Sequence, residues 1–406
     1  MKQSTFRRSM LVAAVAGVLA FGAVTQAQAQ SATERAAEHR AGRSQKSDGK
    51  KTVKVVKQYP DATRTSPAAQ ATAKVTPKLR KMMSQYDAAK GAEARAIADE
   101  IIANSAANAY DHAFAAQIAA QIAYEADDTT AALAYLKKAL EFNGLDNNGH
   151  FGVMLMLGQL QLQEDKYGEA LATLDRFLNE TKTQKPEHLV LKGNALYRLD
   201  RFPEAVTVLK QAIAASPEPK DDWQQLLMGA YFETGQGAEA AKIAEDLAAR
   251  KPSDKRAQMN LAAVYLQGDM YDKAVAVLEK LRSAGQFTED KDYRQLYSAY
   301  LNLDGKEKQA AGVINDGIAK GVLKPDFQAY LALAQSYYFS DQTALSIDAY
   351  KKAAPLALDG ETYLNLARVL WQEDRIAEAR EAARQAIAKG VKKPADAKKI
   401  LALPGK

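Results

Sequence analysis

The sequence predicts an all-α solenoid of antiparallel helix pairs, and three observations lead to that prediction. Beyond residue 77 the chain is rich in Ala and Leu and is broken every twelve to fifteen residues by Gly or Asp. After those breaks one phrase returns, as EDKYGEALATLDRFL, GDMYDKAVAVLEKL and EDRIAEAREAARQAI. The phrase also recurs at a regular spacing. A period in this range, built from two short helices, is typical of stacked pairs that bury one continuous core.

The first 29 residues are expected to be a signal peptide. Lys2, Arg7 and Arg8 precede an apolar run, Met10 to Val24, that is too short to span a bilayer comfortably. Ala27-Gln28-Ala29 then supplies the small residues that a signal peptidase needs, so we expect cleavage after Ala29 and a periplasmic location. The chain has no cysteine, so no lipidated cysteine is available to tether the exported protein.

Residues 30–76 are expected to form a disordered basic linker. The stretch is poor in core residues and carries ten Lys or Arg against four Asp or Glu. A modest charge on such an arm is weak support for nucleic acid, and we expect no nucleic-acid partner. No later apolar run has the length of a membrane helix, so no integral membrane segment is expected after cleavage.

The repeat is followed most easily at a small residue of the second helix in each pair. These residues are spaced 33 to 38 apart and are Ala132, Ala170, Ala205, Ala240, Ala274, Ala310, Ser346 and Ala379. Twelve residues earlier the position is nearly always small, because two helices in close contact need a small residue on each. Five residues earlier it is always Gly or Asp, which suits a turn that needs left-handed φ or a helix cap. Four residues later it is apolar or aromatic and is expected to contact the first helix of the next pair.

These units resemble tetratricopeptide repeats, whose pattern is W-x₂-L-G-x₂-Y…A-x₃-F…P. Leu227, Tyr231, Ala240 and Pro252 fit the pattern, although the leading Trp is missing from every unit. The resemblance implies a right-handed superhelical solenoid whose first helices line a concave groove. We assign eight repeats to residues 112–393, a degenerate N-terminal capping helix pair to 77–111, and a C-terminal capping helix and tail to 394–406.

No enzyme is predicted. The absence of cysteine excludes disulfides, thiolate metal sites and Cys nucleophiles, and no P-loop, G-x-S-x-G elbow or H-E-x-x-H is present. His112, His150 and His188 are each 38 residues apart, so they lie on successive units, too far apart for one metal ion. We expect them to be solvent-exposed residues at helix starts. No metal or cofactor is expected.

The candidate binding face follows from the repeat register. One and four residues beyond the small position of each first helix, amides and aromatics are frequent; aromatics grip apolar groups, and carboxamides can bond an extended backbone. The alternative is that some of these aromatics only pack between helices. The predicted groove residues are Tyr124, Gln159, Asn194, Tyr197, Phe232, Gln335, Tyr338, Arg368 and Trp371.

The sequence therefore predicts a non-enzymatic periplasmic scaffold that binds an extended segment of an envelope protein. The layout of signal peptide, basic arm and repeats resembles the periplasmic repeat proteins that accompany TonB–ExbB–ExbD systems, which implies partners in the TonB complex or its receptors. Two alternatives stay open: a scaffold for cell-wall or outer-membrane assembly, and a polysaccharide-binding solenoid whose aromatics stack on sugar rings.

Overall fold

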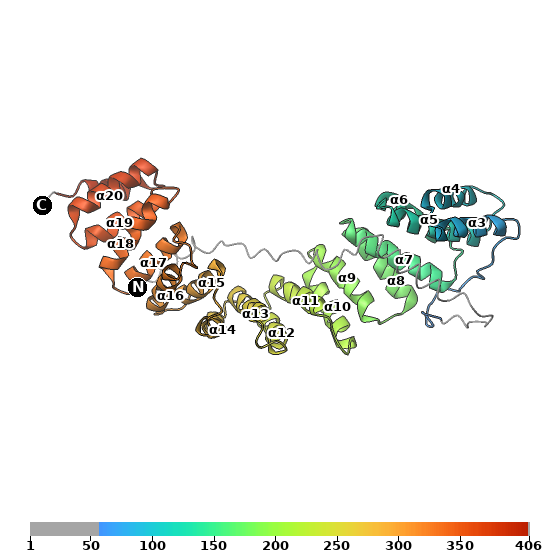
Figure 1. Cartoon of the computed structure of the whole chain (residues 1–406), viewed down its shortest axis with the longest axis horizontal. Coiled ribbons are helices and arrows are strands. Elements are labelled where there is room, and N and C mark those ends of the chain that lie inside the picture. Colours follow the sequence, from blue (N-terminus) through green and yellow to red (C-terminus); the bar gives the residue numbers. More distant parts are fainter. Residues whose placement is uncertain (1–56, 405–406) are drawn as a thin grey trace. The chain divides into compact units, whose positions relative to one another are not determined.

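The structure, a computed structural model, describes residues 57–404. Within that range it is all-α, with nineteen α-helices and one 3₁₀ turn (Figure 1). The described chain divides after Gln236 into two units, which we call the N-terminal unit (57–236) and the C-terminal unit (237–404). No helix in the described range combines the length and the apolar character needed to cross a bilayer. The predicted signal peptide and residues 30–56 of the predicted linker lie outside the described residues.

The N-terminal unit is a series of helix pairs, coloured blue to light green in Figure 1. Its helices are α3 (Thr76–Asp87), α4 (Gly91–Ile102), α5 (Ala109–Glu125), α6 (Thr129–Phe142), α7 (Asn147–Gln163), α8 (Tyr167–Thr181), α9 (Pro186–Arg198), α10 (Phe202–Ala215) and α11 (Asp221–Glu233). From α3 to α10, each odd-numbered helix packs against the even-numbered helix that follows it. We call the odd-numbered helices first helices and the even-numbered ones second helices.

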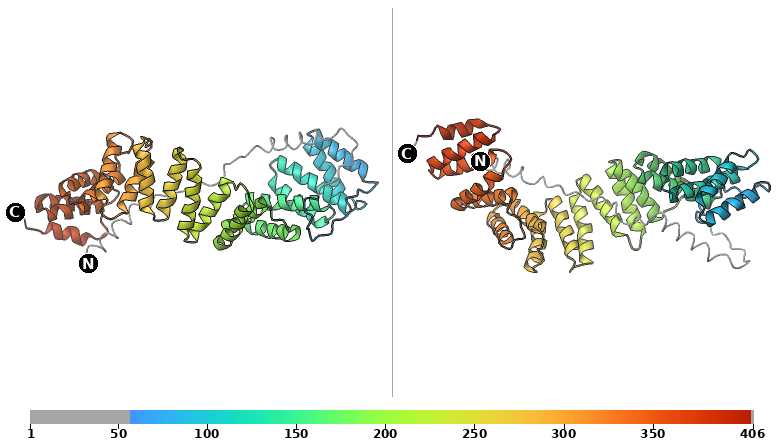
Figure 2. Two further views of the ribbon diagram at one scale, coloured as in Figure 1. Left: turned by 90° about the horizontal axis from the view of Figure 1, so that it is seen from below. Right: turned by 45° about the horizontal axis from the view of Figure 1, so that its top comes forward.

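The C-terminal unit continues the same pattern, as the further views in Figure 2 show. Its helices are α12 (Gly237–Ala249), α13 (Lys255–Gln267), α14 (Tyr271–Ser283), α15 (Asp290–Leu301), α16 (Glu307–Ala319), α17 (Phe327–Phe339), α18 (Thr343–Ala353), η1 (Ala354–Leu356), α19 (Glu361–Gln372), α20 (Ile376–Lys389) and α21 (Pro394–Leu401). The last helix, α21, packs on α19 and α20, at the place where the sequence predicts a C-terminal capping helix.

The turn inside each pair has the backbone that the sequence predicts. All eight Gly or Asp positions adopt left-handed φ, between 53° at Asp374 and 75° at Gly305. Asp tolerates this region better than most residues because its short polar side chain can bond locally. Each pair therefore reverses direction within a few residues.

The small residues of the second helices are confirmed as helix contacts. All eight, from Ala132 to Ala379, have no exposed surface. A Cβ added to Gly193 would lie 2.6 Å from Cδ2 of Leu209, so the first helix of that pair tolerates only glycine here. The expectation that the apolar residue four positions later contacts the next pair is wrong for Leu209, which packs on its own first helix. The reason is that residues i and i+4 share one helix face, so Ala205 and Leu209 face the same partner.

The histidines are not solvent-exposed as expected. His150 has no exposed surface, His188 is 8% exposed, and His112 is half-buried. The ring of His150 lies edge-on to Phe151 with centroids 5.5 Å apart, and that of His188 edge-on to Phe177 at 4.9 Å. Both rings therefore fill space in an aromatic cluster, which the spacing of 38 residues gave no means to foresee.

The expectation of disorder is wrong for the end of the predicted linker. Residues 57–75, which we call the N-terminal segment, lie against helices of the N-terminal unit before α3 begins. Tyr59 is only 7% exposed, and Arg64 bonds residues 79 to 83 positions further along the chain. Sequence composition alone favoured disorder because the stretch offers a single large aromatic to a core.

Candidate functional site

In the N-terminal unit, the predicted groove residues occupy different environments. Gln159 is exposed, whereas Tyr124, Asn194, Tyr197 and Phe232 are half-buried. The Tyr197 ring lies edge-on to Phe202 with centroids 5.4 Å apart. Burial, followed by the nearby Glu233 and Asp200 carboxylates, raises the pKa of Tyr197. Tyr197 therefore contributes to packing around α9 and α10.

In the C-terminal unit, four predicted groove residues lie on α17 and α19. The Tyr338 hydroxyl of α17 donates to Oε1 of Gln372 at the end of α19, over 3.1 Å. Arg368 forms an ion pair with Asp396 of α21 at 2.7 Å, so it is engaged within the fold. Gln335 is 7% exposed and belongs to the core, but Trp371 is 44% exposed. Of these four, Trp371 offers the most surface to a partner.

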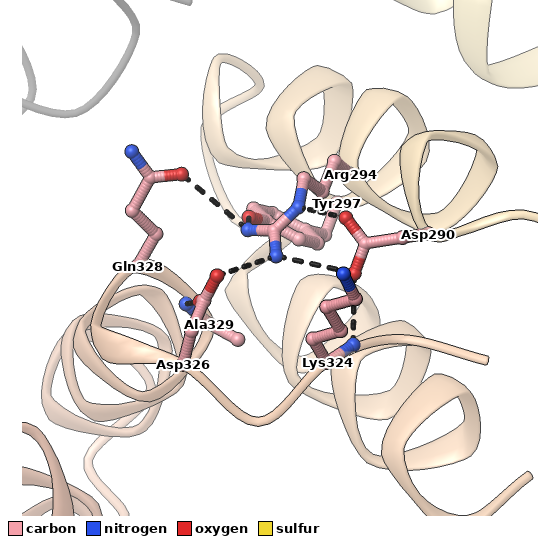
Figure 3. Close-up of polar contacts among 7 residues, drawn as sticks. All are labelled: Asp290, Arg294, Tyr297, Lys324, Asp326, Gln328 and Ala329. Carbon is pink, nitrogen blue, oxygen red and sulfur yellow. Dashed lines mark hydrogen bonds and ion pairs between the residues drawn. The ribbon is translucent and has the colours of Figure 1, made fainter. Parts of the chain in front are cut away.

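A guanidinium fixes the spacing of two first helices in this unit (Figure 3). Arg294 of α15 bonds the Asp290 carboxylate on its own helix and reaches Oδ2 of Asp326, the N-cap of α17, at 2.7 Å. Its Nη1 also lies 3.4 Å from Oε1 of Gln328. Burial alone would lower the pKa of Arg294, but the bonds to Asp290 and Asp326 and the field of Tyr297 raise it overall. The charged side chain thus holds α15 and α17 in one register, beside the face that carries Tyr338.

A cleft between α3 and α5 was not predicted from the sequence. It encloses about 520 Å³, and it is lined by Ala71, Thr76, Leu79, Arg80, Met83, Ser84, Asp87, Tyr110 and Phe114. The rings of Tyr110 and Phe114 are stacked, with centroids 5.7 Å apart and planes 13° apart. Burial, followed by the Asp146 and Asp111 carboxylates, raises the pKa of Tyr110. The site thus has an apolar floor with Arg80, Ser84 and Asp87 exposed at its rim.

The sequence did contain a signal for this cleft. Phe114 stands seven residues before Gln121, a position on the predicted binding face, and seven residues bring a helix back to the same side. Met83 occupies the corresponding register in α3. We assigned 77–111 to a cap, and for that reason the register was not continued into α3.

The chemistry available in these sites is recognition by shape, aromatic contact and hydrogen bonds. In the described part of the chain, no group of three His, Asp or Glu side chains is arranged to hold a metal ion. The two buried histidines lie in the aromatic cluster, away from the cleft lining. The arrangement therefore fits binding of a ligand with apolar groups and a hydrogen-bonding backbone.

Comparisons with known families agree with the repeat register. A tetratricopeptide repeat-like domain model matches residues 61–229, and two tetratricopeptide repeat models match 231–300 and 360–385. None of the three describes an enzyme. Comparison with curated proteins gives no match.

Several solved structures resemble parts of the chain. A tetratricopeptide repeat protein from Parabacteroides merdae is 16% identical, covers 63% of this chain and 98% of its own, and has a TM-score of 0.40. The C-terminal part of a repeat protein from Cytophaga hutchinsonii is 15% identical, covers 61% and 100%, and has a TM-score of 0.49. MamA of MSR-1 is 26% identical over 42% of this chain and 95% of its own, with a TM-score of 0.34. The family matches, which together span more than half of the chain, and the buried repeat register show that this chain is a tetratricopeptide repeat protein.

Proposed function

We propose that this chain is a non-enzymatic periplasmic scaffold whose first helices bind an extended segment of a partner protein of the cell envelope. The α3–α5 cleft is the observation that carries the binding part of the proposal. Its volume of about 520 Å³ lies within the usual range for ligand pockets, and its apolar floor suits one or two side chains of a peptide.

The stacked aromatic pair defines what such a segment offers. The Tyr110 and Phe114 rings form a nearly flat apolar surface on which a proline ring or an aliphatic side chain can lie. Arg80 and Ser84 can donate to peptide carbonyls at the rim, and Asp87 can accept from a peptide N–H. An extended peptide presents both kinds of group, whereas a helix satisfies them internally.

Trp371 is the second anchor in this proposal. It is a large aromatic that stays 44% exposed at the end of α19, next to the Gln372 side chain that Tyr338 fixes. Exposed aromatics backed by ordered neighbours are frequent among the residues that carry binding energy at interfaces.

The location and the partner class rest on the sequence. The predicted signal peptide supports export, and the layout of the chain supports a link to TonB-dependent transport, with partners in the TonB complex or its receptors. N-terminal sequencing of the protein from its native cells tests the first point. The proposal expects a chain that begins at Gln30, and an intact Met1 on membrane-bound protein would contradict it.

Site-specific photocrosslinking tests the binding face. A photoreactive phenylalanine derivative is placed at Phe114, at Trp371 or, as a control, at Leu358, which is fully exposed in the α18–α19 connection. Each variant is irradiated with an envelope extract. The proposal expects the same protein adduct from positions 114 or 371 and none from 358. An oligosaccharide adduct would support the polysaccharide-binding alternative, and equal adducts at all three positions would remove the groove from consideration.

A further inference from the structure

The N-terminal segment crosses one edge of the N-terminal unit, where the chain runs from α6 into α7 and where α8 ends. In Figure 1 it is the blue chain that precedes α3. We define the α6–α8 edge by the residues that the segment contacts: Asn143, Leu145, Asn147, Asn148, Phe151, Phe177 and Glu180. The segment forms no helix of its own along this edge.

An aromatic residue holds the beginning of the segment. The Tyr59 ring lies edge-on to both Phe151 and Phe177, with centroids 5.2 and 5.7 Å away. Both phenylalanines are fully buried, and Tyr59 itself is 7% exposed. The backbone N–H of Gln58 donates to Oδ1 of Asn148 over 3.0 Å. The ring therefore occupies a pocket that the helices line with aromatic edges.

The backbone of the segment completes the end of a helix. The N–H of Thr63 donates to the carbonyl of Glu180 in the last turn of α8, over 2.8 Å. Carbonyls in the last turn of a helix have no partner within the helix, so a neighbouring chain that supplies N–H groups is favourable there. This contact depends on an extended backbone, not on the side chain at position 63.

An arginine holds the second end of the segment, and only neutral oxygens receive it. Arg64 donates to the carbonyls of Asn143 and Leu145 at 3.1 and 3.0 Å, and to the side-chain oxygens of Asn143 and Asn147, each at 2.7 Å. Nδ2 of Asn147 donates back to the Arg64 carbonyl over 2.9 Å. Four acceptors around one planar guanidinium match its fork of donors, which the single ammonium of a lysine cannot do.

The next edge along the array lacks this seat. Asn143 adopts left-handed φ of 49° at the end of α6, and the residue in the same position at the end of α8 is Lys182, with φ of 56°. The N-cap of α9 is Lys185, where α7 has Asp146. Two lysines would repel an arginine, so the α6–α8 edge is specific within this unit's middle pairs.

We propose that the α6–α8 edge is a peptide-binding site for an extended segment in which an aromatic residue precedes an arginine by five positions, and that Tyr59–Arg64 occupies it in cis as a competitor of such a segment from a partner protein. The site is separate from the first-helix face and does not depend on the function proposed for that face. A tethered ligand competes at an effective concentration in the millimolar range, so a free peptide gains access mainly when the tethered one is weakened.

Binding of a labelled peptide tests the proposal. The probe is a synthetic peptide of residues 57–68 with an N-terminal fluorophore, and the receptor is the full chain, either wild type or Tyr59→Ala/Arg64→Ala. We expect the double variant to bind the probe at least tenfold more tightly than the wild type, measured by fluorescence anisotropy. A probe with arginine replaced by lysine at position 64 should bind at least tenfold more weakly than the native probe.

Receptor-side variants connect binding to the edge. In the double variant, Asn143→Gly and Asn147→Ala should each abolish binding of the probe, because they remove acceptors for the arginine. Lys182→Gly is the matched control: it changes the equivalent left-handed position and should leave binding unchanged. Glycine suits both positions, so helix content by circular dichroism should remain that of the parent.

Two results would overturn the proposal. One is a folded double variant that binds the probe no better than the wild type does. The other is a wild-type chain that forms dimers in sedimentation experiments and loses them with Tyr59→Ala/Arg64→Ala, because the occupant would then be the segment of a second copy.

Discussion

Arg64 and Arg294 perform a similar task in the two units, and they differ in where they come from. Arg294 belongs to a repeat helix and joins α15 to α17 through the carboxylates of Asp290 and Asp326. Arg64 comes from outside the repeats and reaches neutral oxygens between α6 and α7. The first arrangement is an ion-pair network built into the array, and the second is a seat for a separate piece of chain.

The difference shows how a repeat array can distinguish support from recognition. An ion pair removed on one side leaves buried carboxylates without a partner, which is costly. Carbonyls that lose an arginine at an edge can be hydrated by water instead. We therefore expect the Arg294 network to determine stability and the Arg64 seat to determine binding.

Removing Arg294 should have the largest effect. Arg294→Ala leaves Asp290 and Asp326 without their shared cation in a partly buried site, and we expect a loss of about 3 kcal/mol in the stability of α15–α17. Arg64→Ala should cost the repeats less than about 1 kcal/mol while residues 57–72 exchange faster. Hydrogen exchange by mass spectrometry measures both. Equal losses at the two sites would refute the distinction between support and recognition.

Acid should act on the N-terminal unit through His150. Burial, followed by the positive charges of Arg64 and Arg176, lowers the pKa of His150 to about 4, against a smaller opposing effect of Glu180. Because the unfolded histidine titrates near 6.5, the folded state loses stability as pH falls from about 6.5 to 4, on the order of 2 kcal/mol at pH 4.5.

Urea unfolding of wild type and His150→Phe at pH 7 and 4.5 checks this expectation. The variant should keep more of its neutral-pH stability on acidification, and His112→Phe serves as the control at a half-buried ring. An acid sensitivity that is the same in His150→Phe and wild type would assign the effect to other groups.

Overpacking should affect the two units alike. Ala205→Leu and Ala274→Leu each insert bulk where the native side chain has no exposed surface, and each should cost roughly 1–3 kcal/mol. Thermal melting of the two variants is the measurement. If one of them melted like the wild type, the helix contact assigned to that position would be wrong.

Truncating exposed aromatics should have the smallest effect on stability. Trp371→Ala should lower it by less than about 1 kcal/mol, since 44% of the residue is exposed, yet weaken capture of a crosslinked partner by about 2 kcal/mol or more. Tyr197→Ala should do the reverse, because its ring packs on Phe202. A Trp371→Ala variant that unfolds easily but still captures the partner would place Trp371 in the core instead.

Features that repeat could be predicted from the sequence, and features that occur once could not. The left-handed turns at Asp127 through Asp374 and the buried contacts at Ala132 through Ala379 follow from spacing alone, because each pair solves the same packing problem. The seat of Arg64 depends on residues about 80 positions away that share no period with it. Nothing local to Arg64 distinguishes it from the other basic residues of the arm.

The candidate sites show the same division. Trp371 and Gln159 lie exposed on first helices, as the register suggests, but the register cannot show that Gln335 is enclosed or that Arg368 is paired with Asp396. Both outcomes depend on which side chains neighbouring helices supply. The α3–α5 cleft was missed because an atypical pair was assumed to serve only as a cap.

The contact between Thr63 and Glu180 also sets an order of events in time. The two residues are 117 positions apart, so a ribosome adding 5–20 residues per second completes the end of α8 roughly 6 to 20 seconds after it has made Thr63. The helix pairs need only contacts between neighbours and can form as soon as both helices are present. The N-terminal segment, although synthesised before every described helix, is therefore the last of these parts to find its place.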